Sequence, residues 1–234
     1  VAAGARERVG FETSRMARRL YTRVALYHAD RHHAERLWSL AIATGAVAPR
    51  DPLRPRLYPG ADERRAVDAV LGDGAVAPLV APLVALAPGS VWATKRWPYY
   101  PALAARLAER ARIVVVGGGG DRALAAEIVA ACPGGRAIDA TGRLSLLASA
   151  ELIGRAALLV TNDSAPQHLA SAMGTPTITV YGPTVPEFGF GPLAPRSATA
   201  GHPALACRPC DPHGPQRCPL GHWRCMRELA PDAV

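Results

Sequence analysis

From about residue 81 onward, short apolar runs alternate with stretches of helical spacing along the chain. The apolar runs are rich in Val, Ile and Leu, which predicts buried strands. Between them, apolar residues recur every three or four positions, which predicts helices of moderate length. This alternation favours an α/β fold, a Rossmann-like parallel sheet with helices on both faces. The predicted strands are 83–86, 113–116, 137–139, 158–161 and 177–181, and the predicted helices are 102–111, 121–131, 145–155 and 166–173.

The chain before residue 81 follows a different pattern. Residues 15–27 and 34–43 have helical spacing, so this part is predicted to be mostly helical. Prolines at 49, 52, 55 and 59 interrupt the pattern and predict an extended linker. After residue 192 the chain is rich in Pro, Cys and His and shows little periodicity. The predicted parts are a helical segment 1–48, a Pro-rich linker 49–80, a Rossmann-like domain 81–200 and a Cys-rich tail 201–234.

The composition narrows the class of protein. Apolar residues make up 49% and charged residues 20%, which is typical of a globular protein. The net charge of +8 raises the question of nucleic acid, but the arginines are spread along the chain and aromatics are only 6%. We therefore expect no nucleic-acid partner, and phosphate-bearing substrates or peripheral contact with an anionic membrane explain the charge equally well.

The start of the sequence and the lengths of its apolar runs indicate the cellular compartment of the protein. No apolar run approaches the ~20 residues of a membrane span, and no signal segment is visible at the start. We therefore expect a cytoplasmic protein. The sequence opens with Val1 rather than Met, which predicts a piece of a longer protein.

The strongest candidate site is the run Asn162-Asp163-Ser164-Ala165-Pro166-Gln167-His168 after a predicted strand. Pro166 stands where a first helical turn begins, and free N–H groups there bind anions such as a pyrophosphate. The small Ala165 lets a phosphate approach, and His168 falls in the first turn, where it adds a donor. The alternative is that Asp163 or Ser164 simply caps the helix and His168 is a surface residue.

A second candidate loop spans residues 88–98, from Pro-Gly-Ser to Lys-Arg-Trp-Pro. It also follows a predicted strand and carries hydroxyls and a cation before a helix. Lys95 is the only lysine in the chain, and its compact charge suits a departing phosphate. The alternative is a solvated loop with two packing tryptophans.

These two loops also carry a resemblance to a known family. P-G-S-x-x-x-x-K-R-W-P, T-N-D-S-A-x-x-H, Y-G-P-T-x-P and the terminal C-x-P-C…C-P-L-G-H-x-x-C-M resemble glycosyltransferase family 9, most closely its heptosyltransferase II group. The match covers roughly residues 80–234, and residues 1–48 resemble the family more weakly. The resemblance implies a GT-B enzyme, with two Rossmann-like domains facing across a cleft and the C-terminal one holding the nucleotide sugar.

The resemblance further implies transfer of heptose from ADP-heptose to the lipopolysaccharide inner core at the inner face of the inner membrane. The transfer is inverting and uses no catalytic cofactor or metal. Ser90 and Lys95 would contact the diphosphate, with Lys95 stabilising the leaving group. The phosphate and sugar would be lined by Asp163, Ser164, Ala165 and His168, with Thr184 on the neighbouring loop.

Two departures from the family pattern matter. The family usually has a carboxylate near residue 147 or 148 that can hold the ribose, but Leu147 and Ala148 occupy these positions and Glu151 is the nearest substitute. Nothing before Pro49 resembles the first strand, its glycine-containing loop or the catalytic aspartate of the N-terminal domain. We therefore expect a chain that lacks most of the acceptor-binding half and binds donor with little or no turnover.

The sequence is also compatible with other functions. Gly118, Gly120 and Ala123 fit G-x-G-x-x-A, and Asp139 follows at the distance of a ribose-binding acid, so an NAD site is one reading. The other reading of this run is a tight turn with Asp121 capping a helix. A non-catalytic nucleotide-sugar sensor or scaffold and a UDP-dependent transferase are further alternatives.

The tail places four cysteines at 207, 210, 218 and 225, with His213 and His222 between them. In a cytosolic protein this favours metal over disulfides. Cys207, Cys210, Cys218 and Cys225 therefore predict either a structural zinc site or free thiols. Cys132, in an apolar helix, is predicted to be a core residue.

Overall fold

The computed structural model describes residues 4–13, 15, 17–42, 53–72 and 81–234. The chain forms two compact units, one of residues 1–54 with 187–191 and a larger one of residues 55–186 with 192–234. No helix in the described ranges is long and apolar enough to cross a membrane.

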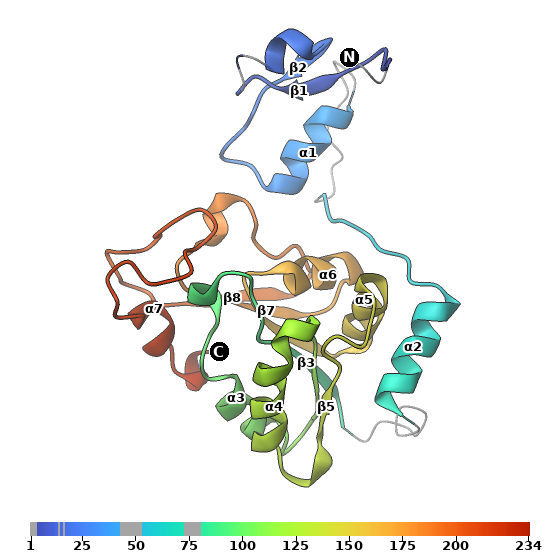
Figure 1. Cartoon of the computed structure of the whole chain (residues 1–234), viewed down its shortest axis with the longest axis vertical. Helices are drawn as coiled ribbons and strands as arrows, with labels where there is room; N and C mark the ends of the chain where they lie inside the picture. Colours follow the sequence, from blue (N-terminus) through green and yellow to red (C-terminus); the bar gives the residue numbers. More distant parts are fainter. Residues whose placement is uncertain (1–3, 14, 16, 43–52, 73–80) are drawn as a thin grey trace. The chain divides into compact units, whose positions relative to one another are not determined.

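A six-stranded sheet forms the centre of the larger unit (Figure 1). All strands are parallel, in the order β5-β4-β3-β6-β7-β8. Five of them confirm predicted strands. The sixth, β8, was missed because Ser-Ala-Thr-Ala-Gly contains no large apolar side chain and its first three residues are exposed at the sheet edge. The bounds are β3 (Leu83–Ala87), β4 (Arg112–Val115), β5 (Ala137–Asp139), β6 (Leu158–Asn162), β7 (Thr177–Tyr181) and β8 (Ser197–Gly201).

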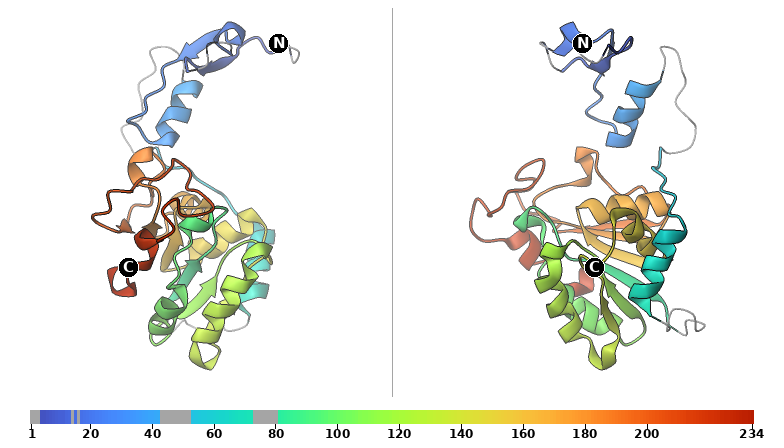
Figure 2. Two further views of the ribbon diagram at one scale, coloured as in Figure 1. Left: turned by 60° about the vertical axis from the view of Figure 1, so that its left-hand side comes forward. Right: turned by 45° about the vertical axis from the view of Figure 1, so that its right-hand side comes forward.

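Helices cover both faces of this sheet, as predicted for a Rossmann-like fold (Figure 2). In β3 the side chains alternate between the faces, so that Val84 and Leu86 join one apolar core while Leu83 and Ala85 join the other. The first core lies under α3 (Tyr100–Leu107) and α4 (Arg122–Ala131). The second lies under α2 (Ala61–Leu71), α5 (Leu146–Arg155) and α6 (Ala165–Met173).

The helix α2 corrects the prediction of a linker over 49–80. Val67 is fully buried in α2 and Leu71 nearly so, both in the core shared with α5. The Glu63 carboxylate accepts from the Gly60 N–H over 2.7 Å and caps the helix. Pro55 and Pro59 therefore mark only the approach to the helix, with residues 53–60 irregular. Residues 49–52 and 73–80 of the predicted linker lie outside the described ranges.

The predicted boundary at residue 200 also needs correction, because it runs through β8 and the tail belongs to the larger unit. Cys225 and Met226, on the short helix α7 (Arg224–Arg227), are buried in the core beneath α3. The Trp97 indole N–H donates to the Leu229 carbonyl over 2.8 Å. The tail shows little helical or strand periodicity because a few apolar residues pack in the core while the segments between them are irregular.

The smaller unit contains a pair of parallel strands, β1 (Val9–Phe11) and β2 (Arg23–Ala25), and the helix α1 (His33–Ala41). The prediction of a helix over 15–27 was wrong, because β2 pairs with β1 and this pairing overrides local helical spacing. The helix predicted over 34–43 is present as α1. Its Arg36 is buried and donates to the backbone carbonyls of residues 28, 29 and 188 and to the Tyr27 hydroxyl, which ties the unit together.

The described ranges also contain short 3-10 helices. Their bounds are η1 (Ala17–Leu20), η3 (Ala93–Lys95), η4 (Gly119–Asp121), η5 (Pro133–Gly135), η6 (Pro186–Phe188) and η7 (Pro231–Ala233).

Candidate functional site

The strand order creates a crevice between β3 and β6. The chain moves from β3 through β4 to β5 on one side of the sheet and then returns to β6 on the other. At such a switch point the loops after the two central strands diverge, and ligands bind outside the carboxyl ends of the strands. The loops that carry both candidate motifs, 88–98 and 163–168, follow β3 and β6.

A cavity of about 450 Å³ opens at this position. It is lined by residues of the β3, β4 and β6 loops and by the start of α5. Three of the predicted site residues line it, namely Ser90, Ser164 and Ala165. Most of the remaining wall is apolar, including Leu144, Leu146, Ile153 and Leu169. The cavity thus combines an apolar part, large enough for a planar ring, with polar groups at one end.

The helix α6 begins at this polar end. Ser164 is its N-cap residue and makes no side-chain cap hydrogen bond, while the Gln167 N–H donates to the Ser164 carbonyl over 3.1 Å. Its hydroxyl instead points back to the Asn162 carbonyl, at 3.4 Å. Ala165 is exposed at the helix start and Pro166 follows it. The side-chain cap expected in the alternative interpretation is absent, and the positive end of the α6 dipole lies at the cavity wall.

Asn162 joins the two loops, a role that the sequence analysis did not assign to it. Its side chain is fully buried and donates to the Pro88 carbonyl over 2.7 Å. Its Oδ1 accepts from the Trp97 N–H at 3.2 Å and from the Tyr100 hydroxyl at 3.3 Å. The only signal in the sequence was that Asn162 is the sole asparagine of the chain.

Lys95, Asp163 and Thr184 form a buried polar cluster behind the cavity wall. The Lys95 Nζ donates to Oδ2 of Asp163 over 2.6 Å, and the Thr184 hydroxyl donates to the same oxygen over 2.7 Å. The three residues are at most 8% exposed, and none of them lines the cavity. The structure therefore brings these predicted residues together, but with one another rather than at the cavity surface.

The cation at the cavity surface is Arg96, which the sequence analysis did not select. Its side chain lines the cavity, and its Nε donates to the Ser90 carbonyl over 3.0 Å. His168, in the first turn of α6, is half-buried and is not a lining residue. Nothing in the sequence favoured Arg96 over its neighbour Lys95 as the cation at the cavity surface.

Glu151 does not replace the missing carboxylate of α5. It pairs with Arg155 over 2.8 Å, and Arg155 also pairs with Asp68 on α2. Glu151 lies outside the cavity lining, so the suggested substitution is wrong in this structure. The acidic residue that does line the cavity is Asp121, in the turn after β4.

The structure does not favour the NAD alternative. The glycine run follows β4, whereas the switch point lies between β3 and β6. Asp139 is engaged locally, because its Oδ1 accepts from both the N–H and the hydroxyl of Thr141, and it does not line the cavity. The glycine run forms the short turn η4 before α4, with Asp121 accepting from the Gly118 N–H.

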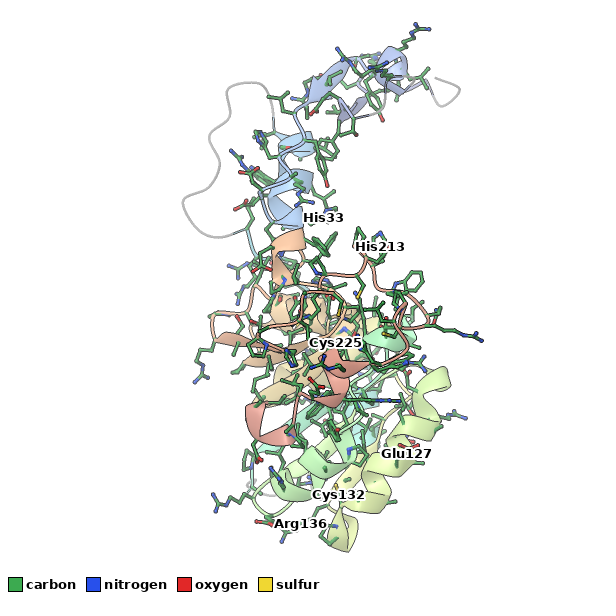
Figure 3. The ribbon with its side chains drawn as sticks, turned by 90° about the vertical axis from the view of Figure 1, so that its left-hand side faces the viewer. His33, Glu127, Cys132, Arg136, His213 and Cys225 are labelled. Carbon is green, nitrogen blue, oxygen red and sulfur yellow. The ribbon has the colours of Figure 1, made fainter. Side chains whose placement is uncertain are left out.

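The tail cysteines lie near one another and form no disulfide. Cys225, on α7, is labelled in Figure 3. Burial and the neighbouring thiols, Cys210 first among them, raise the pKa of Cys225 to about 11. Burial raises the pKa of Cys218 too, but backbone N–H groups of residues 220–223 outweigh it and leave that pKa lowered. Cys132 is buried, as predicted.

In the described ranges, no three His, Cys, Asp or Glu side chains are arranged to hold a metal ion. The residues as placed therefore do not form a ready zinc site. The zinc alternative remains a prediction, and metal analysis of the purified chain tests it: about one zinc ion per chain supports it, and none favours the free thiols.

Comparison with known proteins relates this geometry to a family. A sequence model of glycosyltransferase family 9 (heptosyltransferase) matches residues 1–220. Lipopolysaccharide heptosyltransferase 2 of Salmonella typhimurium is 30% identical over 162 residues, which cover 66% of this chain and 47% of that protein. The chain spans less than half the length of the curated relatives that it matches, from 23% in one to 47% in another.

Two solved structures share the fold. The structure of E. coli ADP-heptose LPS heptosyltransferase II has a TM-score of 0.77 at 24% identity and covers 99% of this chain and 68% of its own. E. coli heptosyltransferase WaaC with ADP-2-deoxy-2-fluoro heptose has a TM-score of 0.64 at 20% identity, with coverages of 97% and 63%. These similarities confirm the predicted Rossmann-like, GT-B fold class.

Proposed function

This chain belongs to glycosyltransferase family 9, and from that premise we propose that its larger unit binds ADP-heptose for transfer to the lipopolysaccharide inner core. The observation that carries the proposal is the open N-terminus of α6 at one end of a largely apolar cavity. A diphosphate would bind at the start of α6, and a nucleoside would pack in the apolar part of the cavity. A related enzyme, E. coli WaaC, was solved with an analogue of ADP-heptose, which supports the choice of donor.

In this proposal the pyrophosphate lies against Ser164 and Ala165. The dipole of α6 and the N–H of Ala165 attract its negative charge, and the small Ala165 side chain leaves room for it. The guanidinium of Arg96, on the facing loop, adds a cation at the cavity surface. The adenine would pack among the apolar side chains of the cavity.

The proposed reaction is an inverting displacement. An acceptor hydroxyl attacks the anomeric carbon, the bond from that carbon to the phosphate oxygen breaks, and ADP leaves with the bonding electron pair. The acceptor proton passes to a base. Negative charge that grows on the leaving phosphate is stabilised by groups already in place, here the positive end of the α6 dipole and Arg96. We expect donor binding with little or no turnover from this chain, because the described wall of the cavity carries no acidic or histidine side chain beyond Asp121 to act as the base.

We assign Lys95 a positioning role at the leaving group. Its ammonium is bound to Asp163, and Asp163 directly precedes the N-cap of α6. The pair thus fixes the loop of Arg96 relative to the phosphate-binding helix. No catalytic metal is included, because the cavity wall in the described ranges holds a single carboxylate and Mg²⁺ is usually bound by carboxylates together with phosphates.

The acceptor places the proposed reaction at the inner face of the inner membrane. Lipopolysaccharide precursors are lipid-anchored, and a net charge of +8 would attract the chain to an anionic leaflet. Co-sedimentation with anionic vesicles at low salt, lost in neutral vesicles, is the expected result. Equal binding to both kinds of vesicle would contradict this placement.

Isothermal titration calorimetry tests the donor proposal. We expect ADP-heptose and ADP to bind, with no loss of affinity in EDTA, and a UDP-sugar to bind more weakly. A chain whose circular dichroism shows intact folding but that binds neither ADP nor ADP-heptose would refute the proposal. A preference for the UDP-sugar would favour the UDP-dependent alternative.

A further inference from the structure

The tail segment 211–217 packs against the loop that follows β3. His213, labelled in Figure 3, belongs to this segment. Gly214 is buried and has a φ of +86°, a backbone conformation that glycine adopts more readily than other residues. A Cβ atom there would lie 3.1 Å from Cγ of Pro183 and 3.2 Å from Cε of Lys95. The segment therefore lies directly on the side chain of Lys95, at the buried cluster that this lysine forms with Asp163.

The start of the tail segment is fixed to the loop after β7. The Cys210 N–H donates to the Pro183 carbonyl over 2.8 Å. The Arg208 guanidinium donates to the carbonyls of Tyr181 and Thr184 over 3.1 and 3.2 Å. Because its start is held at the carboxyl edge of the sheet, the far end of the segment has a defined position relative to the β3 loop.

At that far end, Pro215 and Gln216 bind the main chain of the β3 loop. The Gln216 side chain accepts from the Ala93 N–H at Oε1 over 3.2 Å and donates from Nε2 to the Val91 carbonyl over 2.9 Å. The Pro215 carbonyl accepts from both the N–H and the hydroxyl of Thr94. The tail thus supplies hydrogen-bond partners to the loop along residues 91–94.

This part of the β3 loop controls the polar groups at the cavity surface. Ser90, Val91 and Arg96 line the cavity, and the Val91 side chain is 78% exposed, so it does not anchor the loop in the core. The Arg96 Nε donates to the Ser90 carbonyl over 3.0 Å, and the Trp92 N–H donates to the Ser90 hydroxyl over 3.2 Å. The conformation of residues 91–94 therefore sets where Ser90 and Arg96 lie.

We propose that the tail is part of the donor site and that Gln216 is a positioning residue, which holds the β3 loop so that Ser90 and Arg96 meet the phosphates. The inference rests on the proposed function, because it requires a diphosphate at this end of the cavity. Gln216 is not among the residues that line the described wall of the cavity, so it acts through the loop. Loosening the loop lowers the fraction of chains that are ready to bind, and the apparent dissociation constant rises in proportion.

A double-mutant cycle, measured by calorimetry with ADP, tests this inference. The four proteins are the wild type, Gln216→Ala, Arg96→Ala and the double variant. Gln216→Ala removes two hydrogen bonds to the loop and should weaken ADP binding about 5- to 30-fold. In the Arg96→Ala background the same change should weaken binding by about threefold or less, because the cation that Gln216 positions is already gone.

The control is Leu220→Ala, which truncates a 65% exposed side chain of the same tail and should leave the ADP affinity unchanged. Gln216 is itself exposed, so its alanine variant should fold like the wild type. An equal loss of affinity in both backgrounds would overturn the positioning role, and so would an unchanged affinity in Gln216→Ala. Either result leaves the donor proposal standing, whereas a wild type that binds no ADP would refute the proposed function itself.

Discussion

The ammonium of Lys95 donates to the carboxylate of Asp163 over 2.6 Å, with both residues only 8% exposed. These residues lie on different loops, one after β3 and one after β6. The Thr184 hydroxyl, from the loop after β7, donates to the same carboxylate oxygen. One buried charge pair therefore ties together three loops at the carboxyl edge of the sheet, next to the start of α6.

Breaking this pair should be costly for stability. Lys95→Met leaves the Asp163 carboxylate buried without its partner, and we expect a loss of roughly 3–5 kcal/mol in the free energy of unfolding. The double variant Lys95→Met/Asp163→Leu removes both charges and should recover most of that loss. Urea unfolding measures both. As a control, Arg106→Ala breaks the exposed pair with Asp232 and should cost at most about 1 kcal/mol. A Lys95→Met chain as stable as that control would contradict the buried pair.

The helix α2 should be part of the larger unit rather than a linker. Val67→Asp places a charge in the fully buried position of α2, and we expect the unfolding free energy to fall by more than about 3 kcal/mol. Ala69→Asp adds the same charge at an exposed position of the same helix and should change it by less than about 1 kcal/mol. Equal melting temperatures for the two variants would show that α2 does not pack on the sheet.

Much of the larger unit could be predicted because its strands are buried on both faces and therefore stand out as apolar runs. The edge strand β8 and α2 have no such signal: β8 is largely exposed, and α2 follows a proline-rich segment that obscured its start. In the smaller unit, residues 15–27 gave a helical pattern, but pairing of β2 with β1 decided the outcome.

The site was predicted at the level of loops but not of every side chain. Ser90, Ser164 and Ala165 line the cavity, because the position of a loop after a strand fixes where it lies in a parallel sheet. Which way a side chain points within such a loop depends on contacts from other elements. Lys95 turns inward because Asp163 is there to receive it, while its neighbour Arg96 faces the cavity. Asp121 lines the cavity, and its carboxylate lies where a side chain at Gly89 would begin.

The raised pKa of Cys225 predicts a loss of stability at alkaline pH. Its folded pKa is about 11 against an ordinary value of 9.0, so between these values the folded chain binds more protons than the unfolded chain. The contribution of the Cys225 thiol to the free energy of unfolding is therefore fully present below about pH 9 and is lost as the pH rises toward 11. Melting temperatures of chelator-treated protein at pH 8 and 10.5 should fall less in Cys225→Ala than in the wild type. The same pH dependence in both would contradict a buried, neutral thiol at this position.

The central claim is that a pyrophosphate binds at the start of α6, and Ala165→Glu tests it most directly. Ala165 is exposed there, and a Glu side chain would place negative charge and bulk at the positive end of the helix dipole, where the phosphate would lie. Glutamate near a helix start is favourable, so the melting temperature without ligand should hardly change. The measurement is the melting temperature with and without ADP, with Ala165→Ser as a small, uncharged control. ADP should raise it in the wild type and the control, by about 2.7 kcal/mol of added stability at 100 times the dissociation constant. Ala165→Glu should show its normal melting temperature and no rise with ADP. A full rise in that variant would mean that the phosphates bind elsewhere.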